Sequence, residues 1–126
     1  MSEQKEKVDL WKHGTYIDLW SLVHFLSGVL LASACYYFEL NFTWSAVITL
    51  VLVVLWELLE AILKIIEPRK NVLMDVIIGM AGFYSLGYFH FVRGWPWSAP
   101  LFFSFLFVTL GMSFWGFHDF LRRGYR

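Results

Sequence analysis

Four long apolar runs occupy most of this 126-residue chain and constrain its fold more than any other feature. They cover roughly residues 18–38, 43–66, 71–92 and 97–120. Each run has about the twenty residues that a helix needs to cross the hydrocarbon core of a bilayer. A transmembrane β-barrel does not fit, because its strands are about half as long and alternate in hydropathy. We therefore predict an all-α integral membrane protein with four transmembrane helices.

Hydrophobic residues make up 59% of the chain and charged residues only 16%, which leaves no room for a separate soluble domain. We predict a polar tail over residues 1–17, one transmembrane domain over residues 18–121 and a basic tail over residues 122–126. The ten basic and ten acidic residues cancel, so a nucleic-acid partner has no electrostatic support. The single cysteine, Cys35, excludes an intrachain disulfide and a metal site built from several cysteines.

The basic residues are distributed unevenly between the two ends of the predicted spans. Four spans place both tails and the connection between the second and third spans on one side, and the other side holds only Arg93. The positive-inside rule therefore predicts that both termini are cytoplasmic, in a multi-pass protein of the bacterial inner membrane. Short connections predict an antiparallel bundle. The basic residues of the cytoplasmic side are Lys5, Lys7, Lys12, Lys64, Arg69, Lys70, Arg122, Arg123 and Arg126.

Ionisable residues interrupt three of the apolar runs at similar depths. His24 lies in the first span, Glu57 and Glu60 lie in the second, and Asp75 lies in the third. With a rise of about 1.5 Å per residue, these four lie about 6–14 Å from the cytoplasmic ends of their spans. An ionisable side chain in hydrocarbon is costly, so it usually has a partner or a function. We predict that the four side chains share one polar layer in the cytoplasmic half of the membrane.

Small residues indicate which helix faces meet in this layer. Gly28 follows His24 by one helical turn, and Gly79 follows Asp75 by one turn. Small residues let membrane helices approach closely, and polar groups on the same faces can bond across the contact. We predict that His24 faces Asp75, or that both residues share a glutamate of the second span.

Three further polar residues belong to the same end of the protein. Asp18 lies near the predicted inner interface, Asn71 shares a face with Asp75, and Arg69 is suited to contact a lipid phosphate. The predicted ligand-binding residues are Asp18, His24, Glu57, Glu60, Arg69, Asn71 and Asp75.

Three interpretations of the polar layer stay open. It is a structural network that fixes helix register, a site for a lipid headgroup or another interfacial substrate, or a site that handles cations or protons. The candidates for catalysis and for metal binding are the same four residues, His24, Glu57, Glu60 and Asp75. The histidine is suited to act as a general base. A divalent cation is compatible with the carboxylate oxygens but not required, and zinc normally takes more nitrogen or sulfur ligands than one histidine supplies.

The order of these residues follows three short patterns, which are D…HF…G in the first span, E-x-x-E in the second and R-x-N-x-x-x-D-x-x-x-G in the third. In this order they resemble the VanZ-like group of small membrane proteins and related four-or-more-span families, over about the first two-thirds of the chain. In that group the first Asp commonly precedes the His by four residues, whereas Asp18 precedes His24 by six. The second pattern often ends in Gln where this chain has Glu60. The third usually has Asp before Asn, whereas here Asn71 comes first. The resemblance favours a functional pocket.

Together these observations lead to one functional hypothesis and two alternatives. The hypothesis is a pocket in the cytoplasmic leaflet, built from histidine and carboxylates, that recognises a lipid or envelope-precursor headgroup. The first alternative is a membrane enzyme that acts on such a lipid with a histidine base or a carboxylate-bound cation. The second is a structural subunit of a membrane complex. The expected partners are membrane lipids, together with a second copy of the chain or another membrane protein.

Overall fold

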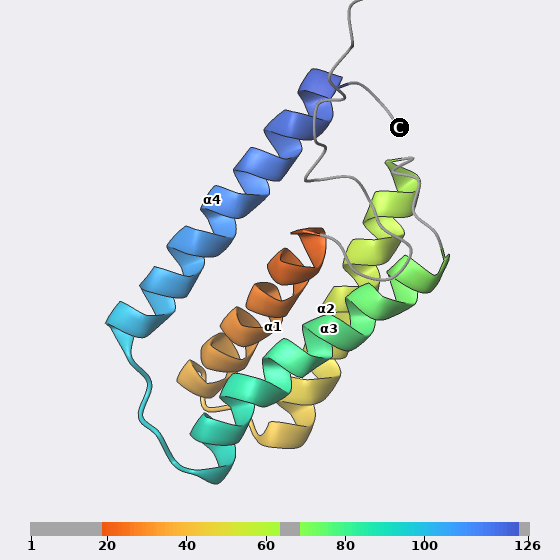
Figure 1. Ribbon diagram of the computed structural model, residues 1–126. Coiled ribbons are helices and arrows are strands. Elements are labelled where there is room, and N and C mark those ends of the chain that lie inside the picture. The colour runs from red at the N-terminus through yellow and green to blue at the C-terminus, as the bar shows by residue number, and fades with distance from the viewer. Residues whose placement is uncertain (1–18, 64–68, 124–126) are drawn as a thin grey trace, which may run out of the picture.

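The computed structural model describes residues 19–63 and 69–123 of the chain. Within these residues the protein consists of four long helices and one short π-helical turn, with no strand (Figure 1). The elements are α1 (Leu19–Tyr37), α2 (Phe42–Ile62), α3 (Arg69–Gly87), η1 (Tyr88–Val92) and α4 (Ala99–Arg123).

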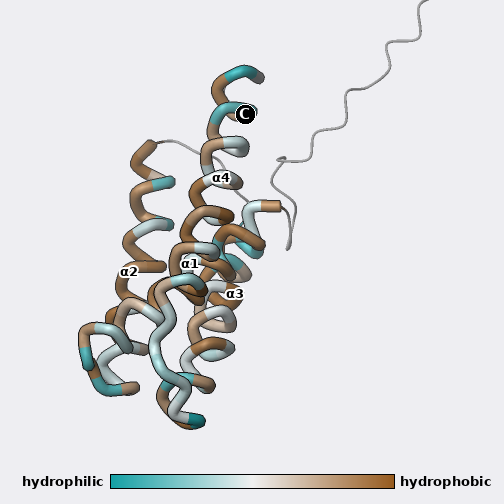
Figure 2. Tube along the Cα trace, turned by 90° about the vertical axis from the view of Figure 1, so that its left-hand side faces the viewer, coloured by the Kyte–Doolittle hydropathy of each residue, from teal (hydrophilic) through white to brown (hydrophobic). Residues whose placement is uncertain are grey.

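Each long helix, with η1 counted as the end of α3, is long and apolar enough to cross a membrane. The four segments contain 19, 21, 24 and 24 residues, and their mean hydropathy lies between 1.6 and 2.2. Figure 2 shows the hydrophobic residues along the middle of each helix. For the described residues, this confirms the predicted all-α chain with four spans by length and composition. The composition also indicates a multi-pass membrane protein.

The helix starts follow from capping side chains. The Asn41 side chain accepts a hydrogen bond of 2.8 Å from the backbone N–H of Trp44 and so caps α2. Ser98 Oγ accepts one of 3.3 Å from the backbone N–H of Leu101 at the start of α4. At its other end α2 stops at Ile62, earlier than the predicted end near residue 66. Residues 64–68 lie outside the described residues.

The third span differs from the prediction at both ends. It begins at Arg69, two residues earlier than expected, and its last turn is not α-helical. From Tyr88 to Val92 the helix widens to a π-helix. The backbone N–H of Arg93 accordingly donates to the carbonyl of Tyr88, five residues earlier, at 3.0 Å. The hydropathy pattern does not predict the π-helical turn. In a membrane span, an α-helix and a π-helix both carry apolar side chains on all sides, so their sequences look alike.

Helices α1 and α3 pack in direct backbone contact. A Cβ atom on Gly28 would overlap the carbonyl oxygen of Gly79, and one on Gly82 would overlap the carbonyl oxygen of Phe25. Only glycine permits such an approach between membrane helices. A Cβ atom on Gly79 would also lie 3.2 Å from a methyl group of Val53, so α2 packs against the same point. The first three helices therefore form one tightly packed unit.

Helix α4 is held much less closely. Only 11% of the most apolar stretch of α4 is buried inside the protein, compared with 50% of the corresponding stretch of α1. Among the described residues it packs mainly against α1, and Figure 1 shows it set apart from α3. Most of its side chains, including Phe107 and Phe114, point outward. Their exposure is the pattern expected of a helix whose surroundings are apolar.

Candidate functional site

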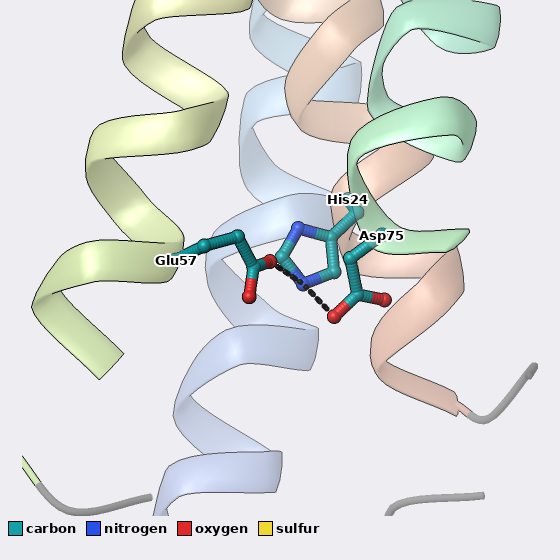
Figure 3. Close-up of side chains that lie close together, drawn as sticks. All are labelled: His24, Glu57 and Asp75. Atoms are coloured by element: carbon teal, nitrogen blue, oxygen red, sulfur yellow. Dashed lines mark ion pairs between the residues drawn. The ribbon is translucent and has the colours of Figure 1, made fainter. Parts of the chain in front are cut away.

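Three ionisable side chains from three different helices meet inside the bundle. His24 comes from α1, Glu57 from α2 and Asp75 from α3, and the imidazole lies between the two carboxylates (Figure 3). His24 Nε2 is 3.3 Å from Asp75 Oδ2 and 3.8 Å from Glu57 Oε1. Each residue offers one potential metal-ligand atom that lies within 4.8 Å of the other two. We refer to these three residues as the His24 cluster.

The His24 cluster is shielded from the surroundings. Asp75 is 0% exposed, His24 is 7% exposed and Glu57 is 9% exposed. Burying an ionised group is costly unless another charge or hydrogen bonds compensate it. The two carboxylates carry two negative charges when ionised, and His24 contributes at most one positive charge. Protonation of a carboxylate or binding of a cation would reduce the net charge of these three side chains.

The glycine contact between the helices fixes the geometry of the cluster. Gly28 lies one turn after His24, and Gly79 lies one turn after Asp75. Because Gly28 meets the backbone of Gly79, the two helices are closest immediately beside the cluster. Backbone contact of this kind leaves little freedom for the Cα atoms of His24 and Asp75 to separate.

The remaining predicted site residues lie around the cluster. Glu60 and Asn71 are buried and each has an interaction partner, and Glu60 does not belong to the three residues with converging ligand atoms. Arg69 is exposed at the first residue of α3. Asp18 lies outside the described residues. The structure thus brings three of the predicted residues together and places Glu60 and Asn71 one turn away from them.

A largely apolar cavity of about 410 Å³ lies beside the cluster, between α1, α2 and α4. Trp20 and Leu31 of α1, Trp56 of α2 and Phe117 of α4 contribute to its walls. Because Trp20 and Leu31 are eleven residues apart, the cavity follows α1 for about 16 Å. Its volume is within the range of small-molecule binding sites. His24 also lines this cavity, so one side chain belongs to both the polar cluster and the apolar space.

Sequence reasoning did not predict this cavity. Two of its lining residues, Ser27 and Ser113, are small side chains among bulky ones on facing helices. In the sequence, Ser27 lies three residues after His24, and Ser113 lies in a run, residues 97–117, that contains no ionisable residue. A facing pair of small residues is the signal that could have revealed the cavity.

A second buried histidine lies at the opposite end of the bundle. His90 in η1 is 2% exposed, and its Nδ1 lies 2.9 Å from the carbonyl oxygen of Trp95. A carbonyl oxygen only accepts hydrogen bonds, so Nδ1 carries the proton in this contact. The imidazole also stacks on Tyr36, with ring centroids 4.5 Å apart and an angle of 13° between the planes. His90 therefore joins the end of α1 to the segment that leads into α4.

No protein family, no curated protein and no solved structure matches this chain. The resemblance of spans one to three to the VanZ-like group therefore stays a prediction. What the protein does has to be inferred from its own geometry.

Proposed function

We propose that this multi-pass membrane protein binds an amphiphilic lipid or envelope precursor. The polar headgroup would lie at the His24 cluster and a hydrocarbon chain would lie in the adjacent cavity. One observation carries the proposal, which is that His24 both contacts the carboxylates and lines the cavity. A polar group that borders an elongated apolar space matches the division of a lipid into headgroup and chain.

The proposal includes an orientation in the bacterial inner membrane. We place both termini in the cytoplasm, the four helices antiparallel, and the His24 cluster in the cytoplasmic leaflet. The support is the excess of basic residues around the tails and the connection between α2 and α3. The short connection of residues 38–41 between α1 and α2 gives further support.

The polar end of the site would determine which lipid binds. In a bilayer, moving a hydrocarbon chain into an apolar cavity releases little free energy, because the surrounding lipid tails are equally apolar. The headgroup, in contrast, exchanges its interfacial surroundings for contact with His24, the residue of the cluster that lines the cavity. We therefore expect headgroup chemistry to govern selectivity more than chain structure does.

A membrane enzyme that acts on the same lipid is the second candidate. The observation that favours it is the distance of 3.3 Å between His24 Nε2 and Asp75 Oδ2. A carboxylate beside an imidazole can orient the ring and stabilise its protonated form during proton transfer. Hydrolysis or transfer of a labelled lipid in proteoliposomes, lost in His24→Gln, would support the enzyme. Unchanged turnover in that variant would rule out this base.

The binding proposal is tested by filling the cavity without changing the cluster. Ser113 lines the cavity from α4, so Ser113→Phe places a ring in the space proposed for the chain. Ser104→Phe introduces the same ring at an exposed position of the same helix and serves as the matched control. Each protein is purified in mild detergent, and retained lipids are measured by untargeted mass spectrometry. We expect wild type and Ser104→Phe to retain one enriched lipid class, and Ser113→Phe to retain about tenfold less or lower still.

Truncating the histidine tests the polar end. His24→Ala should lose the enriched lipid class, whereas His118→Ala, which changes an exposed histidine of α4, should retain it. The proposal fails if wild type retains no lipid class above its abundance in the membrane extract. It also fails if Ser113→Phe and His24→Ala retain as much lipid as their controls.

A further inference from the structure

The three residues of the His24 cluster have the donor atoms and the spacing of a metal site. Ligand atoms lie about 2.0–2.2 Å from a bound zinc ion, so two ligands of one tetrahedral ion lie about 3.4 Å apart. His24 Nε2 lies 3.3 Å from one carboxylate oxygen and 3.8 Å from another. One ligand atom of each residue lies within 4.8 Å of the others. The two carboxylate oxygens, which lie within 4.8 Å of each other, would have to approach by up to about 1.4 Å to share a tetrahedral ion with the imidazole.

From this geometry we propose that the His24 cluster binds one divalent metal ion through His24, Glu57 and Asp75. The proposal goes beyond lipid binding, because it concerns the same three side chains but requires no lipid.

The donor set indicates the class of ion. One imidazole nitrogen and two carboxylates form a mixed nitrogen and oxygen site, which suits Mn²⁺ and Fe²⁺, and Zn²⁺ where carboxylate oxygens replace the further nitrogen or sulfur ligands it normally takes. Calcium prefers six to eight oxygen ligands, more than these residues provide. Mn²⁺ and Zn²⁺ are therefore the appropriate probes.

The charges of the cluster favour a dication. Two ionised carboxylates and a neutral imidazole carry a charge of −2, which one divalent ion balances in full. Metal binding uses the neutral imidazole, so no proton on His24 is required. A bound dication would lower the electrostatic cost of burying two carboxylates among apolar helices.

The helix packing holds the ligands in place before an ion binds. His24 and Asp75 project from the two helices that touch at Gly28 and Gly79, and Glu57 comes from the helix that packs Val53 against that contact. Metal sites are strongest when rigid elements position their ligands. Ligands on three mutually packed helices meet this condition better than ligands on a connecting loop would.

Metal binding can be measured directly on purified protein. The protein is produced with an affinity tag that contains no histidine, purified in detergent, stripped with chelator and equilibrated with Mn²⁺ or Zn²⁺. Elemental analysis should find about one ion per chain. The isosteric variants Glu57→Gln and Asp75→Asn should bind at least about 10–100-fold more weakly. Glu39→Gln, which changes an exposed carboxylate, is the matched control and should bind like wild type.

A spectroscopic measurement on the wild type does not depend on the folding of any variant. Electron spin-echo spectra of the Mn²⁺-loaded protein should show coupling to one imidazole nitrogen. The coupling should disappear in His24→Gln and persist in His118→Gln. The metal site is overturned if the wild type binds neither ion in a stoichiometric amount. It is also overturned if the bound Mn²⁺ shows no nitrogen coupling.

The two proposals can fail separately. Metal binding is measured on delipidated protein, whereas lipid retention is measured on protein taken directly from membranes. A protein that binds Mn²⁺ but retains no enriched lipid keeps the metal site and overturns lipid binding. A protein that retains the lipid but binds neither Mn²⁺ nor Zn²⁺ overturns the metal site alone.

Discussion

The bundle buries a histidine at each end, and the two are held in different ways. His24 lies between carboxylates from two other helices, beside a cavity. His90 bonds to the backbone carbonyl of Trp95, five residues later in the chain, and stacks on Tyr36. Both residues are almost fully buried, so burial alone does not distinguish them.

The partners of the two histidines differ in the free energy needed to bury them and in their ability to bind a ligand. A backbone carbonyl and an aromatic ring give His90 neutral partners that stabilise a turn. Glu57 and Asp75 give His24 charged partners that are costly to bury and that can bind a ligand, a proton or an ion. We conclude that the His90 end maintains the structure, whereas the His24 end is suited to function. Three tests of this contrast follow in order of decreasing effect on stability, and the first compares Gly28→Ala with the control variant Gly87→Ala.

The largest effect is expected at the glycine contact beside His24. Gly28→Ala adds a Cβ atom that would overlap the carbonyl oxygen of Gly79, so the two helices must separate. We expect a loss of about 3 kcal/mol in the free energy of unfolding, together with loss of metal and lipid binding. Thermal unfolding followed by tryptophan fluorescence in a fixed detergent would measure the loss.

Gly87→Ala makes the same substitution at the other end of the bundle. Its added Cβ atom would lie 3.7–3.8 Å from three aromatic rings, which is an ordinary contact distance. We expect a change within about 0.5 kcal/mol, because replacing glycine by alanine also favours the helix. Equal losses for Gly28→Ala and Gly87→Ala would show that the ends do not differ in packing.

A smaller loss is expected when the structural histidine is removed. His90→Ala deletes the contact to the Trp95 carbonyl and the stack on Tyr36, which together should cost about 2 kcal/mol. Mn²⁺ binding should be unchanged, because His90 lies at the opposite end from the His24 cluster. If His90→Ala abolishes metal binding while the protein stays folded, the assignment of separate roles to the two ends is wrong.

Of the three tests, the smallest loss of stability is expected from neutralising the cluster. The double variant Glu57→Gln with Asp75→Asn preserves side-chain shape and removes two buried charges. Replacing buried charges by neutral groups of similar shape is often neutral or stabilising. In the presence of chelator we therefore expect its free energy of unfolding to lie within about 1 kcal/mol of wild type or above it. A loss larger than that for His90→Ala would indicate that the cluster serves structure first.

Much of the fold could be predicted from the sequence because a bilayer imposes a simple length rule. Apolar runs of about twenty residues predict where the helices lie, to within a few positions. The common depth of His24, Glu57 and Asp75 follows from the helical rise and the order of the spans. The small residues Gly28 and Gly79 indicate the faces that meet.

Other features depend on properties that hydropathy does not contain. In a membrane helix the lipid-facing and protein-facing sides are both apolar, so the pattern of α4 does not show how loosely it packs. The stack of His90 on Tyr36 depends on the π-helical turn, which has no distinct residue pattern. Depth alone could not decide between the two glutamates of α2, and the structure places Glu57 Oε1 3.8 Å from His24 Nε2.

The loose packing of α4 has a consequence for the range of ligands. Two walls of the cavity, on α1 and α2, belong to the unit packed around Gly79, so their spacing is fixed. The third wall is on α4, which is joined to that unit through residues 93–98 and buries little of its surface. A chain that is longer, bent or branched can therefore be accommodated by a small displacement of α4, while the distances among the ionisable side chains stay the same. Under the proposed function, we therefore expect selectivity for the headgroup and little selectivity for the attached tail.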